Sequence, residues 1–360
     1  MNILILVSSL NFGGAEKQAT LDANMLANDH QVFLGMFETG ALSEQLSAQV
    51  KPVMFRKQGY LSTARQLAEF VKSNNIQIIH NHLYAPMIIA SLASLRVSVP
   101  VLWHFHGHHF EVRKLPLNIL SQLPTVKHTI FVCDALADYF DRHFWFPASK
   151  RTVVYNSSQC RKLPDVHPAD DTLRIGFIGR VVGLKRLHYL VNLATFLKEQ
   201  GLANFEIQIV GDGPEREKLE AQANVSGVAH LVNFLGFRSD IEYLYNQFDL
   251  FILPSQEEAL SLALIDAGNC GLPALAFDVG GNREIILDGK TGYIVRSEED
   301  LQEKAYRLCQ DEALRKKLGA AAEQHTHIFS EASHRQQLLD IYRTYVPEEK
   351  VLYETRSEKP

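Results

Sequence analysis

Residues 251–271, FILPSQEEALSLALIDAGNCG, decide the fold of this chain. Their apolar start is typical of a buried strand that ends at Pro254, and the apolar spacing from Leu262 onward predicts a helix that packs on the core. An acidic loop therefore joins the end of a strand to the start of a helix. In α/β proteins built on parallel sheets, such strand ends form the ligand-binding edge.

Two carboxylates stand eight residues apart in this stretch, Glu258 in the loop and Asp266 about one turn into the helix. The free amides and the positive dipole end of the helix favour a phosphate over Leu260, Ser261 and Leu262. Glu258 would then face a polar, uncharged group such as a sugar hydroxyl. In the alternative interpretation, Glu258 only caps the helix and Asp266 lies on a solvated face.

Length and composition limit the classes of protein to consider. A chain of 360 residues exceeds the usual size of one hydrophobic core, so we expect two domains. With 46% apolar and 21% charged residues, the composition is that of a globular protein, and a formal charge of -5 gives no overall attraction for nucleic acid. The four cysteines have no paired spacing, which predicts free thiols and a cytoplasmic location.

No apolar run approaches the ~20 residues that a membrane-spanning helix needs, so any membrane contact must be peripheral. Two aromatic and basic stretches of the first domain, residues 110–120 and 139–151, could lie on a membrane surface, such as the inner face of a cell membrane, if they are helical. The alternative is that Phe140 and Phe144 simply pack along one side of a helix.

Strand-like and helix-like runs alternate along most of the chain. Helices are expected at residues 15–27, 61–73, 85–95, 187–199, 215–224 and 241–247, with apolar strands between them. This pattern predicts two Rossmann-like, doubly wound parallel-sheet domains of the α/β class that face a central cleft. Residues 156–171 lack periodicity and read as a linker. We therefore expect an N-terminal domain at residues 1–165, a C-terminal domain at 166–345 and a tail at 346–360.

Gly13 and Gly14 lie in the first loop between a strand and a helix, where they allow a ligand to approach the backbone. A dinucleotide-binding fold is an alternative here, because Glu38 ends the second strand at the place of a ribose-binding acid. The loop lacks the third glycine and the spacing of that fingerprint. An ordinary turn would explain the same two glycines.

A basic loop follows the first strand of the C-terminal domain. Gly179 and Arg180 come directly after the strand, and Lys185 precedes the next helix. Arg180 can bind phosphate oxygens through two nitrogens, and Lys185 can add a mobile charge. Taken with the helix start after Glu258, these residues predict a diphosphate site that works without a metal. Alone, the loop would read as a solvated basic turn.

Two further loops of the C-terminal domain contain candidate donor contacts. Gly211 lies in the turn IVGDGP, and Phe237 and Arg238 follow Gly236 in a loop where a nucleotide base could lie. The run Gly280 to Glu284 reads mainly as a structural turn before a helix.

Histidines are concentrated near two strand ends of the N-terminal domain. Strand alternation puts His104, His106 and His108 on one face, so a zinc site is an alternative, although no carboxylate or cysteine at ligand spacing supports it. His106, directly before a glycine, is our candidate for a hydrogen bond to the substrate or to the leaving phosphate.

These motifs together resemble the retaining glycosyltransferases of family 4, which have the GT-B fold. The resemblance runs nearly end to end. It rests on GGAEKQ, IIHNH, HFHG, IGRVVGLKR, IVGDGP, FLGF, PSQEEALSLALIDAGNCGLP and GGNRE, followed by DGKTGYIV. In that family a glutamate, seven residues and a second glutamate form the donor site, and Glu258 takes the first position.

The resemblance implies a role for each candidate. Glu258 would contact hydroxyls of the donor sugar, Asp266 would contact the ribose, and His106 would approach the transferring group. Arg180 and Lys185 would hold the nucleotide diphosphate. Two departures stand out: Asp266 replaces the usual glutamate, and Arg186 stands where a glycine is frequent after the lysine.

The chain is therefore expected to move a sugar from a nucleotide-diphosphate donor, expected to be a UDP-sugar, to a hydroxyl of a glycan or lipid-linked acceptor, with retention and without a metal or other cofactor. Family resemblance implies bacterial surface polysaccharide synthesis. The alternatives are a nucleotide-sugar epimerase or hydrolase of the same fold, and a nucleotide-sugar-binding protein that has lost transfer.

Overall fold

The computed structural model describes residues 1–11, 13–107, 114–164, 166–168 and 170–346. The chain forms two compact units. The first unit contains Met1–His104, Leu115–Thr129 and, of the described C-terminal residues, 335–346, and the second is centred on Ile130–His334.

The N-terminal part of the chain builds a seven-stranded sheet in the order β3-β2-β1-β4-β5-β6-β7. The strands are β1 (Asn2–Leu6), β2 (Gln31–Met36), β3 (Lys51–Met54), β4 (Ile78–His82), β5 (Val101–Phe105), β6 (Val126–Phe131) and β7 (Arg151–Val153). The pairings from β3 to β5 are parallel. Strands β4 and β5 are buried along their whole length, although the second half of β4 is polar, with the sequence IIHNH.

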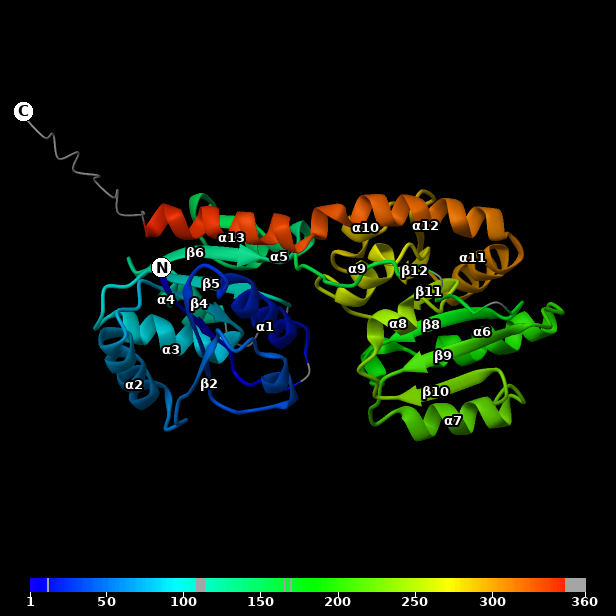
Figure 1. Ribbon diagram of the computed structural model, residues 1–360, viewed down its shortest axis with the longest axis horizontal. Helices are drawn as coiled ribbons and strands as arrows, with labels where there is room; N and C mark the ends of the chain where they lie inside the picture. Colours follow the sequence, from blue (N-terminus) through cyan, green and yellow to red (C-terminus); the bar gives the residue numbers. More distant parts are fainter. Residues whose placement is uncertain (12, 108–113, 165, 169, 347–360) are drawn as a thin grey trace, which may run out of the picture. The chain divides into compact units, whose positions relative to one another are not determined.

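Helices and short 3-10 turns connect these strands (Figure 1). They are α1 (Gly14–Leu26), η1 (Ala41–Gln45), α2 (Tyr60–Ser73), α3 (Tyr84–Ser94), α4 (Lys114–Leu120), α5 (Asp134–His143) and η3 (Ala148–Lys150). The helices predicted at residues 15–27, 61–73 and 85–95 are confirmed with each end within one residue.

The second unit contains a six-stranded parallel sheet in the order β10-β9-β8-β11-β12-β13. Its strands are β8 (Leu173–Ile178), β9 (Phe205–Val210), β10 (Val232–Gly236), β11 (Leu250–Leu253), β12 (Ala274–Phe277) and β13 (Gly292–Val295). The order reverses between the neighbours β8 and β11. Parallel sheets bind ligands beyond the carboxyl ends of the strands at such a reversal, which is where residues 251–271 begin.

The elements that connect this second sheet follow the predicted alternation (Figure 1). They are η4 (Gly183–Lys185), α6 (His188–Glu199), α7 (Arg216–Val225), α8 (Ile241–Tyr245), α9 (Leu262–Asn269), α10 (Asn282–Ile285), α11 (Glu298–Gln310), α12 (Glu312–Thr326) and η5 (His327–Phe329). The prediction of two doubly wound parallel sheets is therefore confirmed.

The last helix, α13 (Glu331–Tyr345), belongs largely to the first unit. The expected division into residues 1–165 and 166–345 had placed this helix in the C-terminal domain. The hydroxyl of Tyr342 lies 2.7 Å from Nδ1 of His80 in β4, and the hydroxyl of Tyr345 lies 3.0 Å from Nδ1 of His128 in β6. These contacts join α13 to the first sheet. The sequence did not predict this, because helical periodicity cannot show which sheet a helix will cover.

The prediction of free thiols is confirmed, since none of the four cysteines is in a disulfide. No helix among the described residues is long and apolar enough to cross a membrane.

Candidate donor site

The loop from β11 to α9 is the predicted centre of the site. Strand β11 is buried throughout, and the chain turns away from the sheet at Pro254. Ser261 is the N-cap of α9, and its hydroxyl accepts a hydrogen bond from the amide of Leu264 at 3.3 Å. The helix therefore begins at Leu262 as predicted. Amides of the first turn, such as those of Leu262 and Ala263, have no partner within an α-helix and can serve an anion.

The loops after β8 and β11 bring a cation and a carboxylate together. Nζ of Lys185 lies 2.5 Å from Oε1 of Glu258, and the two side chains are only 19% and 12% exposed. The amide of Gln256 also donates to the carbonyl of Leu184 at 2.8 Å, so the two loops are joined through the backbone as well. The pairing of Lys185 with Glu258 thus lies beyond the carboxyl ends of the two strands at the reversal of the sheet.

Tight backbone packing holds the neighbouring loop after β9 against the loop after β8. Gly211 has φ +127, and a Cβ atom there would lie 1.9 Å from the carbonyl oxygen of Gly179. The amide of Val181 donates to the carbonyl of Asp212 at 2.9 Å. Only glycine fits at position 211, so Gly179 and Gly211 shape the backbone beside Arg180.

Arg180 is exposed, and its guanidinium group makes no hydrogen bond or ion pair with any residue that the structure describes. Arg186 is a second cation in this region, and we did not assign it a role from the sequence. Its guanidinium carbon lies 5.3 Å from the ring centroid of Phe277, a cation–π contact that leaves its nitrogens available for other partners. Arg180 and Arg186 therefore add positive charge that is in no ion pair with a carboxylate of the described residues.

The backbone of Arg186 fits the glycine that the family resemblance led us to expect at this position. Arg186 ends η4 with φ 48 and ψ 40, in the left-handed region that favours glycine. The sequence signal for this residue was its departure from the family pattern.

The turn at Gly280 and Gly281 supports the acidic loop from the other side. Gly280 has φ +50, and a Cβ atom there would lie 2.0 Å from the carbonyl oxygen of Glu258. The amide of Gly281 donates to the carbonyl of Ala259 at 2.7 Å. These glycines let the turn touch the backbone of Glu258, which agrees with the structural role expected for them.

Asp266 lies inside the second unit and is 3% exposed. The hydroxyl of Ser158 donates to its Oδ1 atom. Buried nearby, Tyr245 has its pKa raised, first by burial and then by the charge of Asp266. Ser158 comes from the segment predicted as a linker, but it is buried and bridges to Ser330. In this structure, Asp266 therefore joins α9 to that segment.

The remaining donor candidates differ in how they are placed. Phe237 is 61% exposed after β10, and Arg238 forms a bidentate pair with Asp240 at 2.8 and 2.5 Å. The side chain of Leu260 is buried, so only its backbone could contact a ligand. Any ligand that binds Arg238 must compete with Asp240 for it.

The other candidates come from the loops that follow β1 and β5 of the first sheet. Gly13 is the N-cap of α1 and Gly14 is its first residue. His106 follows β5 and is partly buried. The alternative zinc site at His104, His106 and His108 cannot be compared as a whole, because His108 lies outside the described residues.

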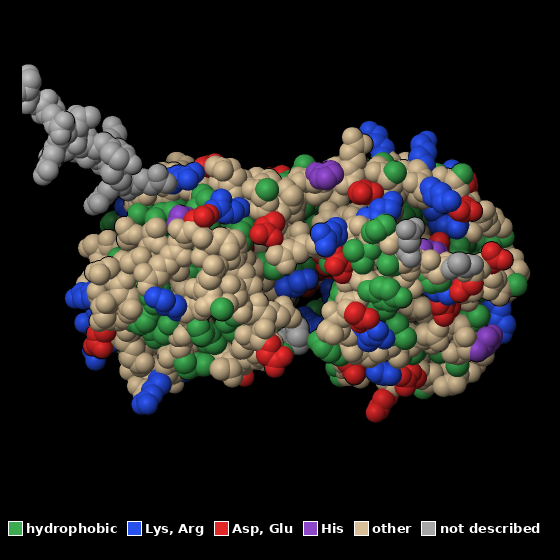
Figure 2. All heavy atoms as spheres, in the orientation of Figure 1, with side chains coloured by type: hydrophobic (Ala, Val, Ile, Leu, Met, Phe, Trp, Pro, Cys, Tyr) green, Lys and Arg blue, Asp and Glu red, His purple; other side chains and the backbone are tan. Residues whose placement is uncertain are grey.

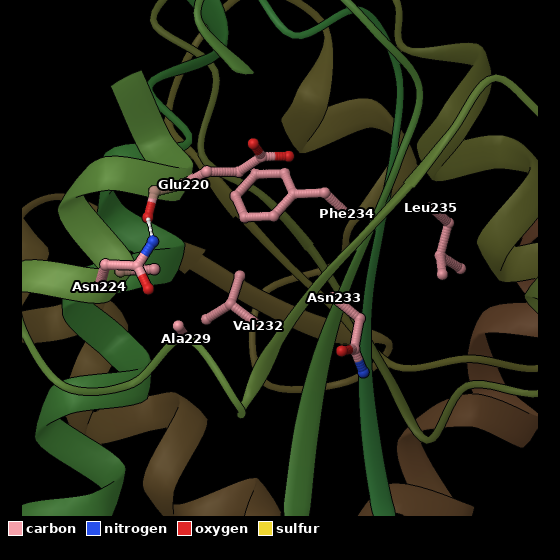
Figure 3. A pocket seen from close by; sticks show the side chains of 8 residues that line it. Glu220, Asn224, Ala229, Val232, Asn233, Phe234 and Leu235 are labelled. Carbon is pink, nitrogen blue, oxygen red and sulfur yellow. Dashed lines mark hydrogen bonds between the residues drawn. The ribbon is translucent and has the colours of Figure 1, made fainter. Parts of the chain in front are cut away.

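A surface depression lies elsewhere on the second unit (Figure 3). It is formed by α7 and the edge strand β10, and its lining residues are Glu220, Ala223, Asn224, Ala229, Val232, Asn233, Phe234 and Leu235. The side-chain amide of Asn224 donates to the backbone carbonyl of Glu220 at 2.9 Å. None of the predicted site residues is among these lining residues, and neither is any Lys or Arg, so we do not identify the depression with the donor site.

Two protein-family models match consecutive parts of the chain. "Glycosyltransferase Family 4" matches residues 12–157, and "Glycosyl transferases group 1" matches residues 161–325. The second match contains the loops that follow β8, β9, β10 and β11.

Relatives of known sequence or structure cover nearly the same length. The putative glycosyltransferase EpsD of Bacillus subtilis is 24% identical over 92% of this chain and 91% of its own. The Escherichia coli UDP-Gal:alpha-D-GlcNAc-diphosphoundecaprenol alpha-1,3-galactosyltransferase is 23% identical over 78% of this chain and 80% of its own. The crystal structure of Anabaena Alr3699/HepE in complex with UDP-glucose has a TM-score of 0.84 at 20% identity, and covers 96% of this chain and 100% of that one.

Proposed function

This chain belongs to glycosyltransferase family 4 and has the GT-B fold, and from that premise we propose that it transfers a sugar from a UDP-sugar to a hydroxyl of a glycan or lipid-linked acceptor, with retention of the anomeric configuration. The UDP-glucose bound to the structural relative supports the proposed donor, and the substrate named for the E. coli relative supports the proposed acceptor class. Bacterial surface polysaccharide synthesis is the setting we infer.

One observation carries the donor assignment, the pairing of Lys185 with Glu258 at 2.5 Å beyond β8 and β11. A sugar diphosphate presents a negative group and neutral hydroxyls close together, which matches a cation beside a carboxylate. On binding, Lys185 would turn to the diphosphate and Glu258 would accept hydrogen bonds from the sugar. Arg180 has no partner to give up among the described residues, so it can bind phosphate oxygens directly.

The other predicted residues complete this proposal. The amides at Ser261 and Leu262, with the backbone of Leu260, face a phosphate, and Gly179 and Gly211 keep the floor of the site free of side chains. Phe237 and Arg238 contact the base. Asp266 reaches the ribose through a water molecule or a small shift of α9, since its carboxylate is buried here. Gly13, Gly14 and His106 serve the acceptor side and the transferring group.

The bond between the anomeric carbon and the oxygen of the β-phosphate breaks, and the acceptor oxygen bonds to that carbon on the same face. The acceptor proton passes to an oxygen of the departing phosphate. Arg180 and Lys185 stabilise the negative charge that grows on the diphosphate, so we propose that transfer needs no metal.

A lipid-linked acceptor would require the first unit to approach a membrane surface. Hydrophobic side chains reach the surface among charged ones on the face drawn in Figure 2. On α4, Leu115 and Ile119 are 62% and 58% exposed and lie one helical turn apart. We include peripheral membrane contact through α4 in the proposal, and binding of the protein to anionic lipid vesicles, lost in Leu115→Ser/Ile119→Ser, would test it.

Nucleotide release from a panel of nucleotide sugars, measured with and without an acceptor extract, tests the proposed reaction. We expect UDP release that depends on the acceptor, and a product with the anomeric configuration of the donor by NMR. Release or isomerisation that ignores the acceptor would support a hydrolase or an epimerase, and binding without turnover would support a protein that has lost transfer. Brief addition of a chelator should leave the rate unchanged.

A further inference from the structure

Three histidines lie together in the interior of the first unit, and the proposed transfer reaction does not use them. His80 and His82 belong to β4 and His104 to β5, and all three are completely buried. The strand register pairs His82 with His104, and alternation along β4 puts His80 on the same face as His82. One nitrogen from each imidazole lies within 4.8 Å of one nitrogen from each of the others.

The distances between these rings fit shared coordination of one ion. Nε2 of His80 lies 3.2 Å from Nδ1 of His104. Two nitrogens that bind the same tetrahedral zinc ion at about 2.0–2.1 Å are about 3.3 Å apart. The ring centroid of His82 lies 4.5 Å from that of His80 and 5.0 Å from that of His104, so a small rotation of the rings would bring the third nitrogen into range.

The groups around the three histidines are those that commonly orient metal-binding imidazoles. The hydroxyl of Tyr342 in α13 lies 2.7 Å from Nδ1 of His80, the ring nitrogen not directed at His104. Oδ2 of Asp22 in α1 lies 3.7 Å from Nε2 of His82. Hydroxyl and carboxylate partners of this kind fix the ring orientation and raise the basicity of the ligand.

Asp22 also supplies the negative charge that a buried cation needs. Both Asp22 and Gln18 are fully buried, and Nε2 of Gln18 donates to Oδ1 of Asp22 at 2.7 Å. A buried carboxylate is expensive unless it is hydrogen-bonded and close to a positive charge. A divalent ion at the histidines would provide that charge within the same cluster.

We propose that His80, His82 and His104, with Asp22 beside them, form a binding site for a divalent transition-metal ion. Zinc suits this site well, because imidazole is a common zinc ligand and the spacing of the nitrogens fits a tetrahedral ion. The ion would join β4 and β5 directly and, through Asp22 and Tyr342, fix α1 and α13. Its role is structural, because the four side chains are buried and lie outside the donor loops. The proposal does not depend on the identity of the donor or acceptor.

A network without metal is the competing account. A proton shared between His80 and His104, together with the Tyr342 contact, would satisfy these nitrogens by hydrogen bonds alone. The two accounts differ in metal content, since only the first requires an ion that remains through purification.

The metal content of the full-length chain decides between them. The protein should carry no histidine tag, because a tag would itself bind zinc or cobalt. After dialysis against metal-free buffer, we expect about one zinc ion per chain by mass spectrometry. After unfolding with a chelator and refolding with Co²⁺, we expect the intense visible absorption of four-coordinate cobalt. Wild-type protein that refolds without binding Zn²⁺ or Co²⁺ would overturn the proposal.

Two single substitutions locate the ion. His82→Gln should lose the zinc and the cobalt absorption, whereas His128→Gln should keep both, because His128 contacts the same helix through Tyr345 but lies outside the cluster. Equal zinc content in both variants would also overturn the proposal. The measurement on wild-type protein decides the question even if His82→Gln fails to fold.

Discussion

The side chains of Lys185 and Glu258 are less than one fifth exposed, so water screens their interaction only in part. In the proposed complex each of them changes partner, from the other side chain to a group of the donor. Removing either one therefore acts on donor binding and on the charge of the transition state.

Lys185→Met and Glu258→Gln should each lower the rate of acceptor-dependent UDP release by about 100-fold or more, the size of effect seen when one stabilising group is removed from a charged transition state. Lys316→Met is the matched control, because Lys316 pairs with Glu312 on the surface of α12. Circular dichroism should show the same fold in all three proteins. Rates within a few-fold of wild type for the first two would refute the assignment.

His128 predicts a pH dependence of stability. Burial lowers its pKa from 6.5 to about 4 in the folded protein. The neutral form is therefore favoured by folding, so its contribution to stability is complete above about pH 6.5 and is lost as the pH falls toward 4. His128→Gln should reduce the loss of unfolding free energy between pH 7 and pH 4.5, measured by urea titration. The exposed His230→Gln is the control, and an unchanged slope in His128→Gln would contradict the prediction.

Sequence reasoning identified Lys185 and Glu258, which the structure places in contact although 73 residues separate them. The two side chains come together because both residues follow strands whose ends meet at the reversal of the sheet. Sequence reasoning could not show that Ser158 binds Asp266, since that contact joins an aperiodic segment to a helix 108 residues away. The histidine cluster was missed for a similar reason, because it depends on strand register and on a helix at the far end of the chain.

Helix α9 supplies the anion-binding amides of the proposed site, and its start depends on one hydroxyl. Removing the N-cap by Ser261→Ala should lower the free energy of unfolding by about 1 kcal/mol and raise the KM for the UDP-sugar. Ser297→Ala is a matched control, because Ser297 caps α11 with a similar hydrogen bond to Asp300 at 3.2 Å. The control should lose similar stability with no change in KM. Equal effects on KM would contradict the role of the α9 terminus.

The loops after β8 and β9 require close backbone approach at Gly211. Gly211→Ala should destabilise the protein by roughly 2 kcal/mol or more, because φ is +127 and the new Cβ would overlap the carbonyl of Gly179. Gly201→Ala shares the positive φ, at +78, but meets no atom within 4 Å, so it should cost only about 1 kcal/mol. Thermal unfolding measures the loss of stability in both variants. Equal decreases in Tm would show that the loop at Gly211 can move to accommodate the new Cβ atom.

Most element boundaries were predictable because long amphipathic helices and buried apolar strands give clear periodic signals. The short strand β3 was not expected, since its four residues, Lys51–Met54, are mostly exposed and show no apolar run. The final helix was expected as a helix, but nothing in its periodicity showed that Tyr342 and Tyr345 would pack on strands of the first unit. Long-range packing of this kind is set by side-chain contacts that sequence spacing does not encode.

At the scale of the whole chain, the two family models meet between residues 157 and 161, beside Ser158. Each sheet has the strand order of a doubly wound domain, with its reversal at β1 and β4 in the first and at β8 and β11 in the second. The candidates for donor binding come from loops of the second sheet, and Gly13 and Gly14 come from the first. In the proposed reaction, the loops of the second sheet would hold the donor, and those of the first would serve the acceptor side.

A crystal structure with a bound UDP-sugar tests this account most directly. We predict that the contact between Lys185 and Glu258 is broken, with Lys185 and Arg180 on the diphosphate and Glu258 on hydroxyls of the sugar. A UDP-sugar bound away from these residues, with the contact of Lys185 and Glu258 intact, would contradict it.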